Sequence, residues 1–314
     1  MDVFSIFIKM AELFSIMVIG YCCCRFGFFK KQARADLTKV IVNIAIPALN
    51  LSAVLTTENL PSRADVFRLM LAAVLFYLFM MLLAVGCSRL PFFPKNKRGL
   101  YSFMFSFPNV GFIGYPVTQA IFGSQAVFYT CIFTIPLGLF MYSVGIIFVR
   151  QDAEENDGEK TGLFDNISYK LFLTPSTVSA AGAILLALLG IQSHGPVGET
   201  CSMIGAMTTP GALLVIGSAL AELPVRDMFG NARVYLFAAI RMLAFPALIY
   251  LLFGLFISDP LLLGECTILS SMPVATNGTM ICLEYGGDEK LMAQGTFITT
   301  LFSMLTIPLL SMLF

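Results

Sequence analysis

Two short segments of the sequence carry amide and hydroxyl side chains beside residues that interrupt helices. The first is SFPNVGFIGYP, residues 106–116, and the second is SSMPVATNG, residues 270–278. Proline lacks a backbone N–H and clashes with the preceding helical turn, whereas glycine tolerates unwound backbone. A helix that begins at such a gap presents free N–H groups and a partial positive charge, which suits a carboxylate. The two segments therefore predict a binding site for a small anion.

The residue types within the two segments divide into helix breakers and hydrogen-bonding groups. We predict helix breaks at Pro108, Pro116, Pro273 and Gly278. The predicted binding residues are Asn109, Gly111, Gly114, Thr276, Asn277 and Thr279. The alternative is that the prolines and glycines produce simple kinks, since both residue types are common in membrane helices. We favour a binding site because the two interrupted segments occupy corresponding places in the chain.

Arg241 is the further candidate for a functional charge. It lies about ten residues into the apolar run VYLFAAIRMLAFPALIY, or roughly 14 Å from the start of the predicted span at 1.5 Å per residue. A charge at that depth is costly and usually marks a functional site or a buried partner. Two interpretations remain open, namely pairing with carbonyl groups of a half-helix and attraction of an anionic ligand.

The composition requires that membrane helices position these residues. The chain of 314 residues is 58% hydrophobic and 12% charged, with a mean hydropathy of +0.85, whereas soluble proteins are about 25% charged. A span needs about 20 apolar residues, and charges and turn signals divide the chain into ten. The predicted spans are residues 4–26, 36–56, 66–88, 99–122, 126–149, 170–191, 200–221, 232–256, 261–284 and 291–313.

The placement of basic residues predicts the orientation of these spans. Most of the 19 lysines and arginines follow spans 1, 3, 5, 7 and 9, and such residues near span ends stay on the cytoplasmic side. We therefore expect a multi-pass protein of the cytoplasmic (inner) membrane, with both termini on the non-cytoplasmic side.

The halves of the chain repeat each other's breaking residues. Gly27, Pro47, Pro108 and Gly123 recur at a nearly constant offset as Gly190, Pro210, Pro273 and Gly286. We predict a first repeat over 1–149, a cytoplasmic linker over 150–169 and a second repeat over 170–314. Because each repeat has an odd number of spans, the second copy must be inverted. Inverted repeats with interrupted spans are typical of secondary transporters.

Enzyme chemistry has little support in the sequence. His194 is the single histidine, the eight cysteines contain no CxxC pair, and the net charge is zero. We therefore predict no metal, no cofactor, no nucleic-acid partner and no enzymatic activity. An intramembrane enzyme is the remote alternative, since Gly286-Gly287-Asp288 lies at a predicted turn without a second intramembrane aspartate.

Four motifs carry a family resemblance over the whole chain. They are Asn43-x-x-x-Pro47, Asn109-x-Gly111-Phe112-x-Gly114-x-Pro116, Met272-Pro273-x-Ala275-x-Asn277 and Ile307-Pro308. With these motifs the chain resembles the auxin efflux carrier family, which includes bacterial carriers and, more distantly, the plant PIN-FORMED carriers. The second motif is the most specific of the four.

The resemblance implies an all-α fold of ten helices like that of sodium/proton antiporters and bile acid carriers, with broken helices 4 and 9 crossing. It implies a scaffold of helices 1, 2, 6 and 7, which can form a homodimer, and a moving transport domain of helices 3–5 and 8–10. It also supports Asn109 and Asn277 as residues at the crossing.

The implied substrate is a small organic anion, either a dicarboxylate such as malonate or malate or an auxin-like monocarboxylate. We expect an electrogenic or proton-linked carrier that is surrounded by membrane lipid. The alternative is a sodium-coupled symporter of the bile acid carrier type. Sodium would need acidic and amide ligands, and spans 4 and 9 show no clear carboxylate at the crossing.

Overall fold

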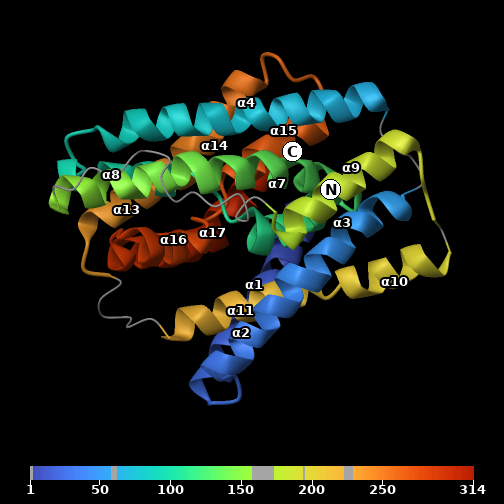
Figure 1. Ribbon diagram of the computed structural model, residues 1–314, viewed down its shortest axis with the longest axis horizontal. Coiled ribbons are helices and arrows are strands. Elements are labelled where there is room, and N and C mark those ends of the chain that lie inside the picture. Colours follow the sequence, from blue (N-terminus) through green and yellow to red (C-terminus); the bar gives the residue numbers. More distant parts are fainter. Residues whose placement is uncertain (1–2, 58–61, 158–172, 194, 223–228) are drawn as a thin grey trace.

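The computed structural model describes residues 3–57, 62–157, 173–193, 195–222 and 229–314 (Figure 1). This described part is helical throughout, apart from turns and one isolated antiparallel bridge. Most of the predicted linker, together with His194, lies outside it. The all-helical class is therefore confirmed.

The first half of the chain forms helices in nearly the predicted places. They are α1 (Val3–Arg25), α2 (Lys31–Val40) with η1 (Ile41–Ala45) and α3 (Ile46–Leu55), α4 (Arg63–Ser88), η2 (Lys95–Lys97), α5 (Arg98–Ser106), η3 (Val110–Gly114) with α6 (Tyr115–Phe122), and α7 (Gln125–Phe140) with η4 (Met141–Gly145) and α8 (Ile146–Asp157). Helix α8 thus continues past the predicted boundary at residue 149 and occupies the first part of the predicted linker.

The second half contains two interruptions that divide predicted spans. Its helices are α9 (Pro175–Leu189), α10 (Pro196–Gly205), α11 (Thr208–Glu222), α13 (Ala232–Ala239) with η6 (Ile240–Ala244) and α14 (Phe245–Phe253), α15 (Pro260–Ser270), α16 (Asn277–Tyr285) and α17 (Glu289–Ser311). The break between α15 and α16 was predicted. The break between α10 and α11, inside predicted span 7, was not.

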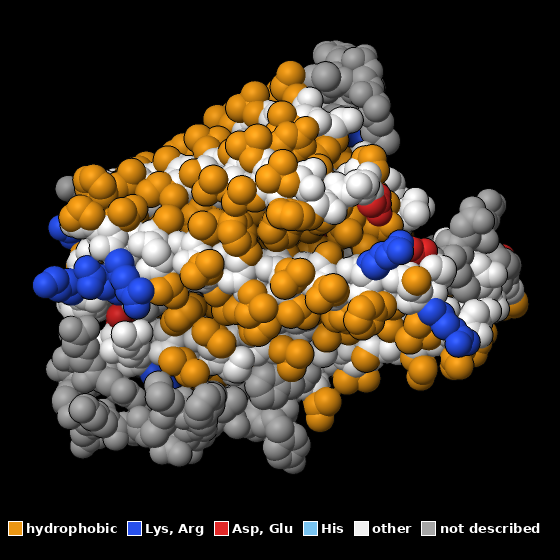
Figure 2. All heavy atoms as spheres, turned by 90° about the horizontal axis from the view of Figure 1, so that it is seen from above, with side chains coloured by type: hydrophobic (Ala, Val, Ile, Leu, Met, Phe, Trp, Pro, Cys, Tyr) orange, Lys and Arg blue, Asp and Glu red, His pale blue; other side chains and the backbone are white. Residues whose placement is uncertain are grey.

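Seven helices among the described residues are long and apolar enough to cross a membrane, and three shorter apolar helices accompany them. Figure 2 shows hydrophobic side chains across the middle of one face, with lysine and arginine toward its two ends. In Figure 1, α4 runs alongside α7 while α2 and α3 cross them obliquely. These features fit a multi-pass membrane protein, and the ten-span count and the inverted repeat stay predictions.

Three prolines lie just after widened, π-helical turns. Pro47 follows η1, Pro116 follows η3 and Pro246 follows η6. In each case the residue four positions before the proline is the middle residue of the wide turn. A proline ring clashes with that carbonyl in a regular helix, and widening the turn relieves the clash. The fourth wide turn, η4, has no such proline.

Helices α1 and α11 pack with their backbones close together. A Cβ atom at Gly217 would overlap the backbone oxygen of Met17, and one at Gly20 would overlap that of Leu214. Small residues permit this close approach of membrane helices. The pair therefore forms a tight contact between two uninterrupted helices.

A buried carboxylate fixes the start of α5. The two carboxylate oxygens of Asp152, on α8, accept hydrogen bonds from the N–H groups of Gly99 at 2.8 Å and Leu100 at 2.7 Å. These N–H groups belong to the first turn of α5, where no helical partner exists. Asp152 thus ties the half-helix that leads into the first break to the end of α8.

Candidate functional site

The two predicted breaks meet in space and pair with each other. The Asn109 N–H donates to the Pro273 carbonyl at 2.8 Å, and the Ala275 N–H donates to the Phe107 carbonyl at 3.0 Å. Pro108 and Val274 face each other as an antiparallel bridge. Breaking a helix leaves backbone groups unpaired, which is costly within hydrocarbon. The breaks satisfy part of this need by pairing with each other, and we call this region the crossing.

Helix α17 supplies a third support for the crossing. The Thr299 hydroxyl accepts a hydrogen bond from the Val274 N–H at 3.1 Å, and the hydroxyl itself donates to the Gly295 carbonyl at 2.7 Å. The Thr299 side chain thereby supplies a hydrogen-bond partner for the Val274 N–H, which has none in the opposite break. The second break is consequently held from two sides.

Asn109 caps the half-helix that begins after the first break. Its side-chain oxygen accepts a hydrogen bond from the Phe112 N–H at 3.3 Å, as expected of asparagine before a helix. Its Nδ2 atom is buried and has no hydrogen-bond partner within the described part of the chain. A buried amide of this kind calls for a partner, so the Asn109 amide can donate to a ligand.

Asn277 begins the half-helix after the second break and contacts another helix. Its Nδ2 atom donates to the Tyr142 hydroxyl at 3.2 Å, and Tyr142 lies in the wide turn η4. The sequence analysis did not identify Tyr142. A tyrosine in a charge-free span carries no distinguishing signal there, and only the packing of α7 against the crossing shows its role.

A cavity of about 140 Å³ adjoins the crossing. Of the predicted residues, Pro108, Asn109, Gly111, Thr276 and Asn277 line it. Residues that the sequence analysis missed complete its walls: Val42, Ile46, Val110, Phe112, Thr134, Leu137, Gly138, Met141, Tyr142, Thr174, Ser176, Thr177 and Ala275. The cavity thus collects amides, hydroxyls and apolar side chains from several helices.

Several predicted residues lie away from the cavity lining. A Cβ atom at Gly114 would lie 3.2 Å from Leu269, and one at Gly278 would lie 2.8 Å from Phe103. Both glycines therefore allow close helix packing in this structure. Thr279 is also absent from the lining, and the assignment of Gly114 and Thr279 to ligand binding stays a prediction. Pro116 and Gly278 were predicted as helix breaks, but they lie in the first turns of α6 and α16.

The cavity is electrically neutral. Within the described residues, no lysine, arginine, aspartate or glutamate lines it, and no group of three or more potential metal ligands occurs. Its polar groups can donate and accept hydrogen bonds. This arrangement suits reversible binding, since amides and hydroxyls without an ionised partner offer little for acid–base or nucleophilic chemistry.

Arg241 is fully buried and contacts the half-helix that ends at the second break. Its Nη1 atom donates to the Ser270 carbonyl at 2.9 Å, at the last residue of α15. Its Nε and Nη2 atoms have no hydrogen-bond partner among the described residues. Arg241 does not line the cavity. Of the two interpretations, pairing with a half-helix carbonyl is the one seen.

Glu265 is a further buried ionisable side chain, and it was not among the residues predicted from the sequence. This fully buried side chain lies on α15 and accepts a hydrogen bond from the Thr130 hydroxyl, which is 2.8 Å from that of Thr118. The other carboxyl oxygen, Oε2, has no partner within the described chain. Residue 265 is near the start of the predicted span, where a charge would be expected to face headgroups. Helix packing encloses it instead.

The chain is similar to membrane transport proteins over nearly its whole length. A family model described as "Membrane transport protein" matches residues 5–311. A protein named "Putative malonate transporter" from Rhizobium meliloti is 24% identical over 306 residues, which cover 94% of this chain and 91% of that protein. Uncharacterized transporters of Methanocaldococcus jannaschii and Methanothermobacter thermautotrophicus are 26% and 22% identical, each over 94% of both chains.

Proposed function

This chain belongs to the membrane transport protein family, that of the auxin efflux carriers, and we propose that it is a secondary transporter of a small organic anion. It works across the cytoplasmic membrane by alternating access. The observation that carries the proposal is the crossing, where two broken helices surround a small cavity lined by amide and hydroxyl groups. Interrupted helices of this kind commonly form transporter sites.

The groups around the cavity are suited to a carboxylate. The Asn109 amide has an unused N–H, and the half-helices that start at Val110 and Asn277 direct the positive ends of their dipoles toward the gap. We assign Asn109, Gly111, Thr276 and Asn277 to the cargo. The absence of charged side chains from the described lining means that these dipoles supply the attraction.

The size of the cavity favours a short cargo. About 140 Å³ is well below the usual range for drug-sized ligands. We therefore propose a dicarboxylate such as malonate or malate, in agreement with the name of the Rhizobium relative. An auxin-like monocarboxylate with a fused ring is the alternative, and it would require a wider cavity.

The movement in this proposal separates a scaffold from a transport domain. The scaffold consists of α1 to α3 and α9 to α11, and the transport domain of α4 to α8 and α13 to α17. Val42 and Thr177, from the scaffold, line the same cavity as Asn109 and Asn277, from the transport domain. The cargo would therefore bind between the two parts, which is where relative movement changes access. A homodimer would form through the apolar outer surface of the scaffold.

Coupling to protons is the favoured form of the proposal. Glu265 is a buried carboxyl group of the transport domain, and a carboxyl group enclosed by apolar surroundings costs least when it holds a proton. Sodium coupling is the alternative. It would require a cage of oxygen ligands, whereas the one hydrogen-bond partner of Glu265 among the described residues is Thr130, whose hydroxyl adjoins that of Thr118.

Uptake by proteoliposomes containing the purified chain tests the proposal. Radiolabelled malonate, malate and indole-3-acetate are offered in turn, with proton and sodium gradients imposed separately. We expect saturable uptake of a dicarboxylate, accelerated by a proton gradient. Acceleration by sodium alone would support the symporter, and the absence of uptake and counterflow for every carboxylate would contradict the proposed function.

A further inference from the structure

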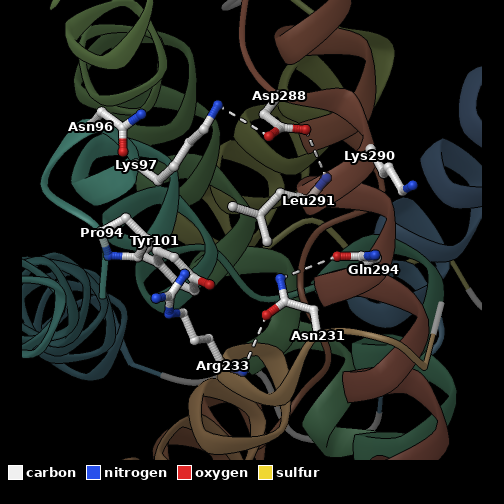
Figure 3. Close-up of a pocket in the computed structure, with 10 residues that line it drawn as sticks. All are labelled: Pro94, Asn96, Lys97, Tyr101, Asn231, Arg233, Asp288, Lys290, Leu291 and Gln294. Carbon is white, nitrogen blue, oxygen red and sulfur yellow. Dashed lines mark hydrogen bonds and ion pairs between the residues drawn. The ribbon is translucent and has the colours of Figure 1, made fainter. Parts of the chain in front are cut away.

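A second hollow lies outside the crossing, between the ends of three elements that the predicted orientation directs to the cytoplasm. Its volume is about 450 Å³. The turn before α5, the start of α13 and the start of α17 form its walls (Figure 3). Basic residues near span ends are expected from the orientation alone. This hollow differs because its basic residues surround a concave space together with amide side chains.

The charges around the hollow do not cancel. Lys97 forms an ion pair with Asp288, with 3.0 Å between Nζ and Oδ2. Arg233 and Lys290 also line the hollow, and neither forms an ion pair with any described residue. Among the described residues, the hollow thus contains one cation paired with a carboxylate and two that form no ion pair.

Asp288 already interacts with two groups, the Leu291 N–H and the Lys97 ammonium. Its Oδ1 atom accepts a hydrogen bond from the Leu291 N–H at 3.0 Å and caps α17. Burial raises the pKa of Asp288, but the Leu291 N–H and the Lys97 ammonium outweigh this effect and hold the pKa below its usual value. The carboxylate therefore stays ionised at neutral pH and neutralises Lys97 rather than Arg233 or Lys290.

The walls hold Arg233 and the amides in place. The side-chain oxygen of Asn231 accepts a hydrogen bond from the backbone N–H of Arg233 at 3.2 Å. The Asn231 Nδ2 atom donates to the side-chain oxygen of Gln294 at 3.5 Å. Figure 3 shows the Arg233 side chain extending from the start of α13 toward Tyr101, which is buried on α5. The guanidinium group is thus presented beside groups that can form further hydrogen bonds.

We propose that this hollow binds the phosphate group of an anionic compound, either a lipid headgroup of the cytoplasmic leaflet or a free phosphate. Arg233 supplies a planar fork that matches phosphate oxygens, and Lys290 supplies the second charge. The ligand would join the start of α13, which holds Arg233, to the start of α17, which holds Lys290.

Ligand-dependent unfolding of the purified full chain in neutral detergent tests this proposal, because a ligand that binds the folded state raises the unfolding temperature. The probes are inorganic phosphate, short-chain phosphatidylglycerol and, as a zwitterionic control, short-chain phosphatidylcholine. We expect a saturable rise with at least one of the first two. A rise with phosphate identifies a free anion, whereas a rise with phosphatidylglycerol alone identifies a lipid.

Two double variants separate the hollow from general surface charge. Arg233→Ala with Lys290→Ala should weaken the apparent affinity about tenfold or more, because it removes both charged donors that would bind the phosphate oxygens. Lys30→Ala with Lys31→Ala removes the same charge from an exposed cytoplasmic turn of the scaffold and should leave the affinity unchanged. Arg233→Lys keeps the charge without the fork and should give an intermediate value.

Three outcomes would overturn the proposal: no saturable rise with either anionic probe, equal losses in both double variants, or displacement of phosphate by malonate. The measurement involves no transport. Failure of the proposed transport function would therefore leave this result interpretable, and the reverse also holds.

Discussion

The crossing and the α1–α11 contact both bring two backbones together, but they do so by opposite means. At the crossing, two helices are interrupted and their released backbone groups pair at 2.8 and 3.0 Å. Where α1 and α11 touch, neither helix is interrupted, and glycines such as Gly217 remove the side chains that would separate them.

The two contacts differ in how many polar groups they leave without a hydrogen-bond partner. An uninterrupted helix satisfies its own backbone groups, so the α1–α11 contact presents nothing to a ligand. A broken helix releases N–H and carbonyl groups, and the crossing pairs only some of them, leaving the Asn109 amide without a partner among the described residues. Within a membrane, close packing of complete helices provides rigidity, and interruption of helices provides a site.

The largest predicted effect concerns the rigid contact. Gly217→Val should abolish most of the folded protein, because the new side chain overlaps the Met17 backbone and overpacking costs about 1–3 kcal/mol or more. Size-exclusion chromatography and the unfolding temperature measure this loss. Gly86→Val, on an open face of α4 with no atom near its Cβ, is the control. If both variants fold equally well, the α1–α11 contact does not have the role given to it here.

The next effect concerns the crossing itself. Asn109→Ala should lower dicarboxylate uptake at least tenfold, since a charge-assisted hydrogen bond of about 1.5–3 kcal/mol is lost. Asn109→Asp keeps the oxygen that caps the half-helix but removes the N–H donors. It should lower uptake at least as much while retaining the unfolding temperature. Normal uptake by the aspartate variant would show that Asn109 only caps its helix.

A smaller effect should connect Asn277 with Tyr142. Asn277→Ala and Tyr142→Phe should each reduce uptake several-fold, because each removes one end of the 3.2 Å hydrogen bond. The double variant should be little worse than Asn277→Ala alone, since the two residues act as a unit. Losses that multiply would mean that the two side chains contact the cargo independently.

The smallest effect concerns the contact between the proposed scaffold and the proposed transport domain. The Tyr115 hydroxyl, on α6, donates to the Asn50 side-chain oxygen on α3 at 2.6 Å. Tyr115→Phe should cost about 1 kcal/mol of stability and change the uptake rate, because this hydrogen bond joins the proposed moving parts. Tyr129→Phe is the control, since that hydroxyl contacts Asp259 within the transport domain, and its uptake rate should be unchanged.

Local chemistry explains which features the sequence could predict. The breaks at Pro108 and Pro273 followed from proline and glycine in apolar runs, and the structure brings both to one place. Tyr142 and Thr134 were not predicted, because their place in the cavity lining depends on how α7 packs against the crossing. Such contacts are long-range, and a residue's type does not reveal them.

Two further features, which the sequence did not indicate, have a different physical origin. The burial of Glu265 could not be inferred because distance along a span predicts depth but not which neighbours enclose a side chain. The predicted span ends at residue 149, where charges follow, whereas helix α8 continues to Asp157. Charges mark the limit of the hydrocarbon and do not end a helix, which can continue into water.

The wide turns before Pro47, Pro116 and Pro246 have a consequence for how sequences of this family can change in evolution. Each contains one more residue than a regular helical turn would need, so gain or loss of a single residue there could be absorbed by switching between wide and regular geometry. Both ends of the helix would keep their neighbours. A single-residue gap at one of these turns, in an alignment with a distant relative, would then mean that the helices on both sides keep their positions in the fold.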